Sequence, residues 1–209
     1  DFYNEAEKES LSITKNNDKP FTVSITGTLQ GSGFDSTPLE AVKYDTVYSD
    51  GTKEVYEFYV KDGYVYENDN GTKTKMTEKE YNGEDNVASA PNYGGIQFLR
   101  DYKDAAITTS GDKTILKFTA SEEDAALWAD DYLAYMPEEM AKLVTDKFTC
   151  EVNKAEVTIT FLSDGSYDSQ VNEMEFVYAD PNDASVSFTC KATYSYSYSW
   201  TEPQVTIPS

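Results

Sequence analysis

The chain has 209 residues, of which 17 are Lys or Arg and 38 are Asp or Glu, giving a net charge of −21. Such a field repels phosphate backbones and anionic membrane surfaces, so we expect neither nucleic acid nor a basic membrane-docking surface. The acidic surplus favours solubility in saline surroundings, with capture of cations or basic partners as the alternative.

The residues of common catalytic sites are scarce. The chain contains no histidine, which removes the commonest general base, the commonest metal ligand and every Ser-His or Cys-His pair. Glycine-rich phosphate-binding motifs and the nucleophile-elbow motif are absent as well. We therefore expect a protein that is not an enzyme and that carries no metal or cofactor. Its two cysteines, Cys150 and Cys190, allow either one disulfide or two small buried side chains.

The first segment of the chain predicts an amphipathic helix. Phe2, Ala6, Glu9 and Ile13 fall near one stripe of a helix over residues 2–13. The helix ends before Pro20, where strand-like alternation begins.

Alternating apolar and polar residues predict a run of hairpins in the first half of the chain. The expected strands cover residues 21–29, 41–48, 55–60 and 64–67. Asp-Gly or Asn-Gly pairs, which suit tight hairpin turns, lie at 50–51, 62–63 and 70–71. The spacing of Thr77 and Glu80 is that of a capping box and predicts a helical turn.

The middle of the chain predicts a loop, a hairpin and the clearest helix. Residues 82–95 lack periodicity and are interpreted as the junction of two halves, followed by a short helix at 96–102. A hairpin over Gly111-Asp112 comes next. A helix capped by Ser121 then carries an apolar stripe that Pro137 kinks or divides. The stripe consists of Trp128, Tyr132, Met136, Met140 and Leu143.

The last part of the chain predicts a meander of three long strands, at residues 155–162, 167–179 and 184–200. Met174, Phe176 and Tyr178 point to one face of the second strand and Glu173 and Glu175 to the other. Alternate aromatic residues at 194, 196, 198 and 200 share one face of the third strand. That face either lines a cavity or packs on the helices.

The order of these elements resembles a known group of proteins. A short N-terminal helix precedes a hairpin run containing YVKDGYVYENDNGTKTKM, and a kinked helix precedes a long meander that ends in VTIP at Val205–Pro208. This is similar to the small extracytoplasmic lipoproteins of Gram-positive bacteria that are related to the LolA/LppX group. The resemblance spans most of the chain and implies an unclosed antiparallel β-barrel whose concave side is plugged by helices, with an apolar cavity for acyl chains.

The resemblance also implies a location. The protein would be extracytoplasmic, at the cell surface or secreted, and would touch a membrane only through a lipid anchor on a cysteine ahead of Asp1. One departure is the high tyrosine content, 17 residues, because carriers of that group are lined with more aliphatic and methionine side chains. A cavity filled by the protein's own side chains is therefore the alternative.

Together these observations predict an α+β fold: a strongly curved antiparallel sheet, the unclosed β-barrel, with helices on its concave face. We expect one monomeric domain over residues 1–209, with loosely repeated halves at 1–81 and 96–209. The predicted function is non-enzymatic binding of a hydrophobic or amphipathic molecule, such as a lipid, between sheet and helices. The predicted ligand-binding residues are Trp128, Tyr132, Met136, Met140, Met174, Phe176, Tyr196 and Tyr198. The alternative is a cell-surface module that binds protein or glycan through exposed tyrosines, and a carboxylate hydrolase is a third reading.

Overall fold

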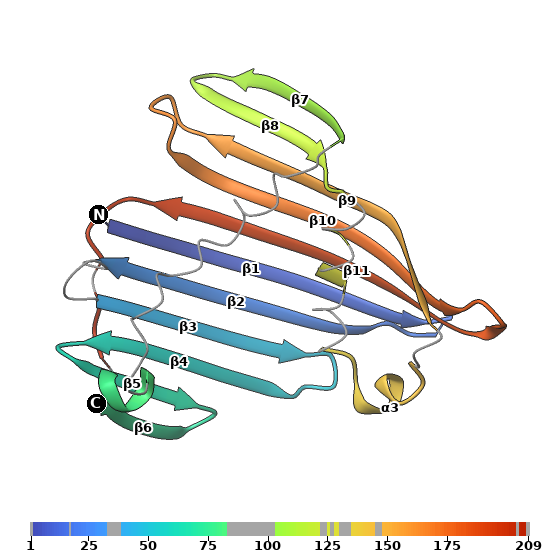
Figure 1. Cartoon of the computed structure of the whole chain (residues 1–209), viewed down its shortest axis with the longest axis horizontal. Helices are drawn as coiled ribbons and strands as arrows, with labels where there is room; N and C mark the ends of the chain where they lie inside the picture. The colour runs from blue at the N-terminus through green and yellow to red at the C-terminus, as the bar shows by residue number, and fades with distance from the viewer. Residues whose placement is uncertain are drawn as a thin grey trace.

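The structure is a computed structural model, and it describes residues 2–16, 18–32, 39–82, 103–121, 125, 128–129, 135–144, 148–203 and 205–207. The described strands form one antiparallel sheet of 11 strands in the order β6-β5-β4-β3-β2-β1-β11-β10-β9-β8-β7 (Figure 1). The sheet is open, since β6 and β7 lie at its opposite ends and are not paired with each other.

Long strands make up most of the described chain. Those of the first half are β1 (Phe2–Lys15), β2 (Phe21–Ser32), β3 (Leu39–Tyr48), β4 (Lys53–Lys61), β5 (Tyr64–Asp69) and β6 (Thr72–Thr77). Those of the second half are β7 (Lys103–Ser110), β8 (Lys113–Thr119), β9 (Thr149–Phe161), β10 (Tyr167–Asp180) and β11 (Asp183–Ser199). The strands predicted from residue 21 onward are confirmed, with boundaries that differ by a few residues.

The sheet consists of two meanders joined through the first and last strands. Each strand from β1 to β6 pairs with the next along the chain, and so does each strand from β7 to β11. The long-range link is the antiparallel pairing of β1 with β11, in the middle of the sheet (Figure 1). The residues with the largest sequence separation therefore meet at the centre of the molecule.

Tight turns explain why the meanders form. Gly51, Gly63, Gly71 and Gly111 all have positive φ angles, between 64° and 92°, which glycine adopts without steric cost. At the end of β6, Thr77 and Glu80 form the predicted capping box. The Glu80 amide donates to Thr77 Oγ1 at 3.2 Å, and the Thr77 amide donates to Glu80 Oε2 at 2.7 Å.

The expected α+β fold with helices on a concave face is wrong. The helices whose bounds the structure describes are short: α1 (Glu78–Asn82) has 5 residues and α3 (Glu138–Ala141) has 4. Pro137 directly precedes α3 with an extended ψ of 142°, so the expected stripe does not continue as a helix through Met136. The helix expected at 96–102 lies outside the described residues.

The helix expected over residues 2–13 is also wrong, because this segment is the central strand β1. Its buried residues Tyr3, Glu7, Leu11 and Ile13 are all odd-numbered, the period of two of a strand. Pairing with β2 on one side and β11 on the other satisfies its backbone groups, and this tertiary context overrides the helical stripe.

One face of the sheet, here called the inner face, carries the core. Its apolar cluster contains Ile13 of β1, Phe176 of β10 and Phe188 of β11, each with 0% of its surface exposed. Ala125, Trp128, Ala129 and Met136 pack onto this cluster from the segment between β8 and β9. The described residues of that segment therefore cover the sheet. Ala125, Trp128 and Ala129 are helical, residues 135–137 are not, and α3 begins at Glu138, which agrees with the expected interruption at Pro137.

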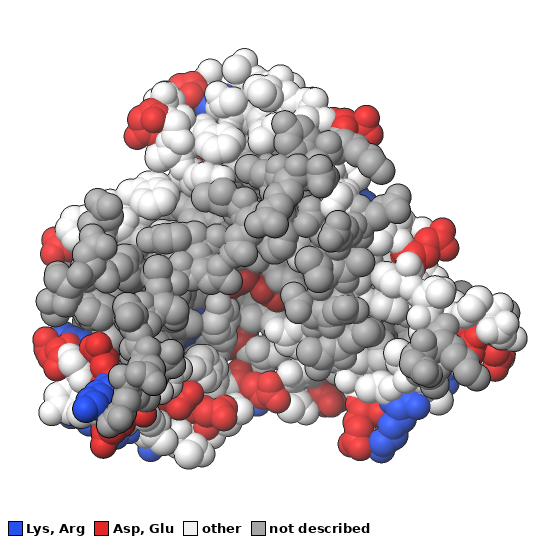
Figure 2. All heavy atoms as spheres, in the orientation of Figure 1, with Lys and Arg blue, Asp and Glu red and all other residues white. Residues whose placement is uncertain are grey.

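The surface reflects the composition. Figure 2 shows acidic side chains distributed around the margin of the molecule, as the net charge of −21 implies. Within the described part of the chain, no helix is long and apolar enough to cross a bilayer. The two cysteines lie on β9 and β11, which β10 separates, with Cys150 exposed and Cys190 buried.

Candidate ligand-binding site on the inner face

The structure places most of the predicted ligand-binding residues on the inner face, but they fall into two different surroundings. Trp128, Met136, Met174 and Phe176 all belong to the apolar cluster, and all four are buried. Met140 is half-buried at the margin of the cluster. Tyr132 lies outside the described residues.

Tyr196 and Tyr198 lie apart from this cluster, in a polar region nearer the other end of β11. With Tyr194 they form a ladder in which neighbouring rings are almost parallel, at centroid distances of 6.2 and 6.4 Å. These rings share the inner face, as predicted from their alternate positions in the sequence. The predicted site is thus divided between an apolar core and a tyrosine ladder.

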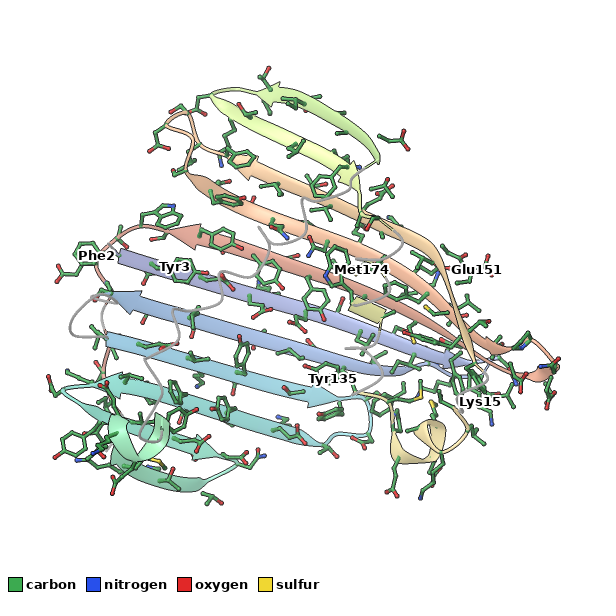
Figure 3. All side chains as sticks on the ribbon, in the orientation of Figure 1. Phe2, Tyr3, Lys15, Tyr135, Glu151 and Met174 are labelled. Atoms are coloured by element: carbon green, nitrogen blue, oxygen red, sulfur yellow. The ribbon has the colours of Figure 1, made fainter. Side chains whose placement is uncertain are left out.

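A narrow crevice marks the boundary between the two. Leu11, Val23 and Ile25 form its apolar side, and Glu9 and Tyr194 form its polar side. Tyr135 closes it from the covering segment (Figure 3). The crevice offers only about 10 Å³ to a water-sized molecule, so the described residues fill the core in this conformation.

The polar region contains carboxyl groups that the sequence analysis did not identify. Glu5, Glu7 and Glu9 lie at alternate positions of β1 and therefore on the same face, about 6.8 Å apart along the strand. In the register of β1 and β11, they are opposite Tyr198, Tyr196 and Tyr194. We call these six residues the glutamate–tyrosine row.

The row extends across the next strand on each side. On β10, Gln170 is opposite Tyr196 and Asn172 is opposite Tyr194. On the other side, Gly27 of β2 lies between Glu7 of β1 and Tyr44 of β3. A band of polar side chains therefore crosses five adjacent strands at the centre of the sheet.

Gly27 makes this band possible. A Cβ atom at this position would lie 2.4 Å from Tyr44 Cε1 and 3.2 Å from Glu7 Oε2. Because glycine has no side chain, the Tyr44 ring lies across β2 and its hydroxyl reaches the Glu7 carboxylate. Burial, together with the same contact, raises the pKa of Tyr44, so this phenol remains a hydrogen-bond donor.

Two carboxyl groups of the row, those of Glu5 and Glu9, resist ionisation. Burial, together with the nearby Glu7 charge, raises the pKa of Glu5 to about 7, although a hydrogen bond from the Tyr3 hydroxyl opposes the shift. Burial and a hydrogen bond to Glu7 raise the pKa of Glu9 to about 9. Near neutral pH, a protonated Glu9 therefore donates to Glu7, which is only 7% exposed.

These carboxyl groups have no basic partner among the described residues. The ion pairs of the described chain all join other residues, such as Lys191 with Glu175 and Lys154 with Glu173 on the opposite face. Buried carboxyl groups are normally paired or bound to a cation, because removing an isolated charge from water is costly. The row therefore has an unmet requirement for positive charge or for protons.

A second polar group at the row also lacks a partner. Gln170 is only 2% exposed, and its amide nitrogen donates to Asn172 Oδ1 at 2.9 Å. Its carbonyl oxygen, Oε1, is buried without a hydrogen-bond partner among the described residues. Leaving such an acceptor unsatisfied costs about 1–3 kcal/mol, so Gln170 is ready to accept a hydrogen bond from a ligand or water.

The chemistry of the row favours a cationic hydrogen-bond donor. The carboxyl groups, phenol oxygens and Gln170 Oε1 are all acceptors, and the carboxyls supply negative charge once ionised. A single metal ion is a poor fit, because no three acidic or cysteine side chains of the described residues converge on one point. An elongated amine suits groups spread along a strand.

The sequence contains a pattern that indicates this row, but the predicted helix over residues 2–13 concealed it. Residues 5–9 read Glu-Ala-Glu-Lys-Glu, which places three carboxyl groups on one face if the segment is a strand. Read as a helix, the same residues spread around the axis and look like an ordinary solvated surface. Gln170, Asn172 and Gly27 carry no distinctive local pattern.

Comparison with known proteins adds no identification. No protein-family model matches the chain, and no curated protein matches its sequence.

Proposed function

We propose that this chain is a non-enzymatic binding protein that holds an amphipathic amine on its inner face. The ammonium group would lie among Glu5, Glu7 and Glu9, and the apolar part would extend toward the crevice beside Leu11. The observation that carries this proposal is the set of three carboxyl groups, Glu7 buried and Glu5 and Glu9 half-buried, without a basic partner among the described residues.

The division of the inner face supports an amphipathic ligand. Glu9 and Tyr194 share one crevice with Leu11, Val23 and Ile25, so charge and apolar surface meet within a few residues. Burial of the apolar part would contribute about 25 cal/mol per Å² of surface removed from water. Because the crevice is narrow, a longer chain requires Tyr135 to move aside. The extracytoplasmic location, the lipid anchor and the monomeric state remain predictions.

A matched pair of probes tests the proposal. Octylammonium and octanoate have the same chain length and opposite charges. Isothermal titration calorimetry with both therefore separates the contribution of charge from that of apolar contact. We expect octylammonium to bind and octanoate not to bind, because the row repels an anion. Equal binding of both probes would show that apolar contact alone is responsible and would contradict the proposal.

A charge-neutralising variant locates the interaction. Glu7→Gln removes one carboxylate while keeping the shape of the side chain, and a charged hydrogen bond is worth about 1.5–3 kcal/mol, or about tenfold or more in affinity. Glu151→Gln is the matched control, because Glu151 is exposed on β9 and lies away from the row (Figure 3). A similar loss in both variants would mean that overall charge, not the row, attracts the amine.

A further inference from the structure

The opposite face of the sheet contains a second and larger hollow, over β4, β5 and β6. Its volume is about 350 Å³, within the range of about 300–1,000 Å³ that small-molecule sites occupy. Ile207, from the described C-terminal residues, closes one side of it. The hollow is separated from the inner face by the strands themselves, since Val60 and Val65 point the other way and are buried.

Two cross-strand rows of side chains form the floor of this pocket. Tyr59 of β4 is opposite Tyr66 of β5, which in turn is opposite Lys75 of β6. The next row consists of Glu57, Asn68 and Lys73 on the same three strands. The floor therefore presents two aromatic rings beside a line of hydrogen-bonding groups.

The polar groups of the pocket are held in place by one another. Asn68 Nδ2 donates to Glu57 Oε2 at 2.7 Å, and Asn68 Oδ1 accepts from the Gly71 amide at 3.0 Å. The Lys75 ammonium lies 4.9 Å from the centroid of the Tyr66 ring and 4.3 Å from that of Tyr64. These contacts fix the amide, the carboxylate and the ammonium before any ligand arrives, which lowers the entropic cost of binding.

The lining carries charges of both signs. Lys73 and Lys75 share this face with Glu57, whereas the Glu67 side chain lies on the face of Val65 and accepts a hydrogen bond from the Tyr56 hydroxyl at 3.2 Å. The pocket therefore offers both donors and acceptors, and its two ammonium groups disfavour a cationic ligand. The net charge of the whole chain, −21, disfavours anionic ligands in turn. A suitable ligand is neutral, carries several hydroxyl groups and has an apolar face for the tyrosine rings.

A sugar ring has these properties. We propose that the pocket over β4–β6 binds a neutral sugar residue, with its C–H face against Tyr59 and Tyr66 and its hydroxyl groups on Glu57, Asn68 and Lys75. This site is independent of the glutamate–tyrosine row, because it lies on the other face and selects a ligand of different charge.

Titration with soluble trisaccharides tests this site. The neutral probes are cellotriose, maltotriose and triacetylchitotriose, and trigalacturonate is the acidic comparison. Saturation-transfer NMR at millimolar ligand detects binding, and calorimetry gives the affinity. We expect at least one neutral probe to bind and trigalacturonate to bind more weakly or not at all. If none of the three neutral probes binds, or if trigalacturonate binds more strongly than they do, the assignment of this pocket to a neutral sugar is wrong.

Two tyrosines of this end of the sheet provide a pair of variants. Tyr66→Ala removes a ring from the pocket floor, whereas Tyr81→Ala removes an exposed ring of α1 that packs on Phe58 and lies outside the lining. We expect Tyr66→Ala to weaken binding of the neutral probe at least about tenfold and Tyr81→Ala to change it by less than about threefold, given the energy of a desolvated ring contact. Equal losses would place the sugar elsewhere. Circular dichroism of both variants checks that each is folded.

Discussion

The two parts of the inner face, the apolar cluster and the glutamate–tyrosine row, differ in side-chain chemistry although they share the same strands. Along β1, the inward side chains are Glu5, Glu7 and Glu9 and then, without a break, Leu11 and Ile13. Along β11, tyrosines in one part give way to Ala192, Cys190 and Phe188 in the other. The apolar part is buried and filled by protein side chains, whereas the polar part contains three carboxyl groups and the Gln170 carbonyl oxygen, which accepts no hydrogen bond from the described residues.

We infer from this difference that stability and the proposed amine binding are located in adjacent parts of one surface. The apolar cluster supplies the burial that holds the sheet and its covering segment together. The polar part opposes folding, because carboxyl groups are removed from water without compensation by basic residues of the described chain. Groups that lower the stability of the folded state in this way are expected where they have a function.

The largest expected effect comes from the apolar part. Phe176 is fully buried between β9 and β11, so Phe176→Ala leaves a cavity and should lower the free energy of unfolding by about 3–5 kcal/mol. Urea denaturation followed by tyrosine and tryptophan fluorescence measures it. Val177→Ala, on the other face of the same strand, is the control and should cost much less. Similar costs would mean that the inner face is not the dominant core.

Gly27→Ala should have the next largest effect, and it should change both the stability of the fold and the binding of ligand. The new Cβ atom would overlap the Tyr44 ring, so the ring must leave Glu7 or β2 must shift. Overpacking of this kind costs about 1–3 kcal/mol. We also expect octylammonium binding to weaken, because Glu7 loses the Tyr44 hydroxyl. Unchanged stability and binding would show that Tyr44 is not held against Glu7.

Glu9→Gln should stabilise the protein in a pH-dependent manner. The pKa of Glu9 is raised by burial from 4.5 to about 9, so between these values the folded state retains a proton that the unfolded state has released. The stability of the wild type therefore falls as the pH rises through this range. Glutamine avoids this cost and can still donate to Glu7.

Thermal and urea denaturation at two pH values measure the effect. We expect Glu9→Gln to raise the free energy of unfolding by about 2 kcal/mol near pH 8 and to change it little near pH 4, where both states of the wild type are protonated. Glu151→Gln should stay within about 0.5 kcal/mol of the wild type at both values, as exposed substitutions usually do. A destabilised Glu9→Gln at pH 8 would contradict burial of this carboxyl.

The smallest effect on stability is expected from Tyr196→Phe, which removes one hydroxyl from the row. Its ring remains stacked between Tyr194 and Tyr198, so we expect the free energy of unfolding to change by less than about 1 kcal/mol. Octylammonium binding should weaken by about threefold to tenfold if the phenol oxygen accepts from the ammonium. Unchanged binding would assign the amine to the carboxyl groups alone.

Much of the fold could be predicted because its pairings are local. Asp50-Gly51, Asp62-Gly63 and Asn70-Gly71 specify hairpins through backbone angles that few other residues adopt, and alternation then fixes which side chains point inward. The faces of Met174, Phe176 and Tyr178 were predicted correctly for this reason.

The central pairing could not be predicted in the same way. β1 and β11 are almost the whole chain apart, and no turn residue specifies their contact. As long as its pairing with β11 is unknown, the sequence of β1 fits the period of a helix as well as that of a strand. The helix was predicted, so the three glutamates were not recognised as lying on one face. The tyrosine ladder was identified, but the carboxyl groups opposite it depended on this long-range register.

The most direct test of the amine-binding row is the pH dependence of octylammonium affinity. The ligand remains an ammonium below about pH 10, as amines of this kind do. Glu5 and Glu9 ionise with pKa values of about 7 and about 9, so ionic attraction grows between about pH 5 and pH 9. We predict that affinity measured by calorimetry rises about tenfold or more over this range, with protons released on binding. Affinity that stays constant, with no proton release, would contradict binding of the amine by the glutamate–tyrosine row.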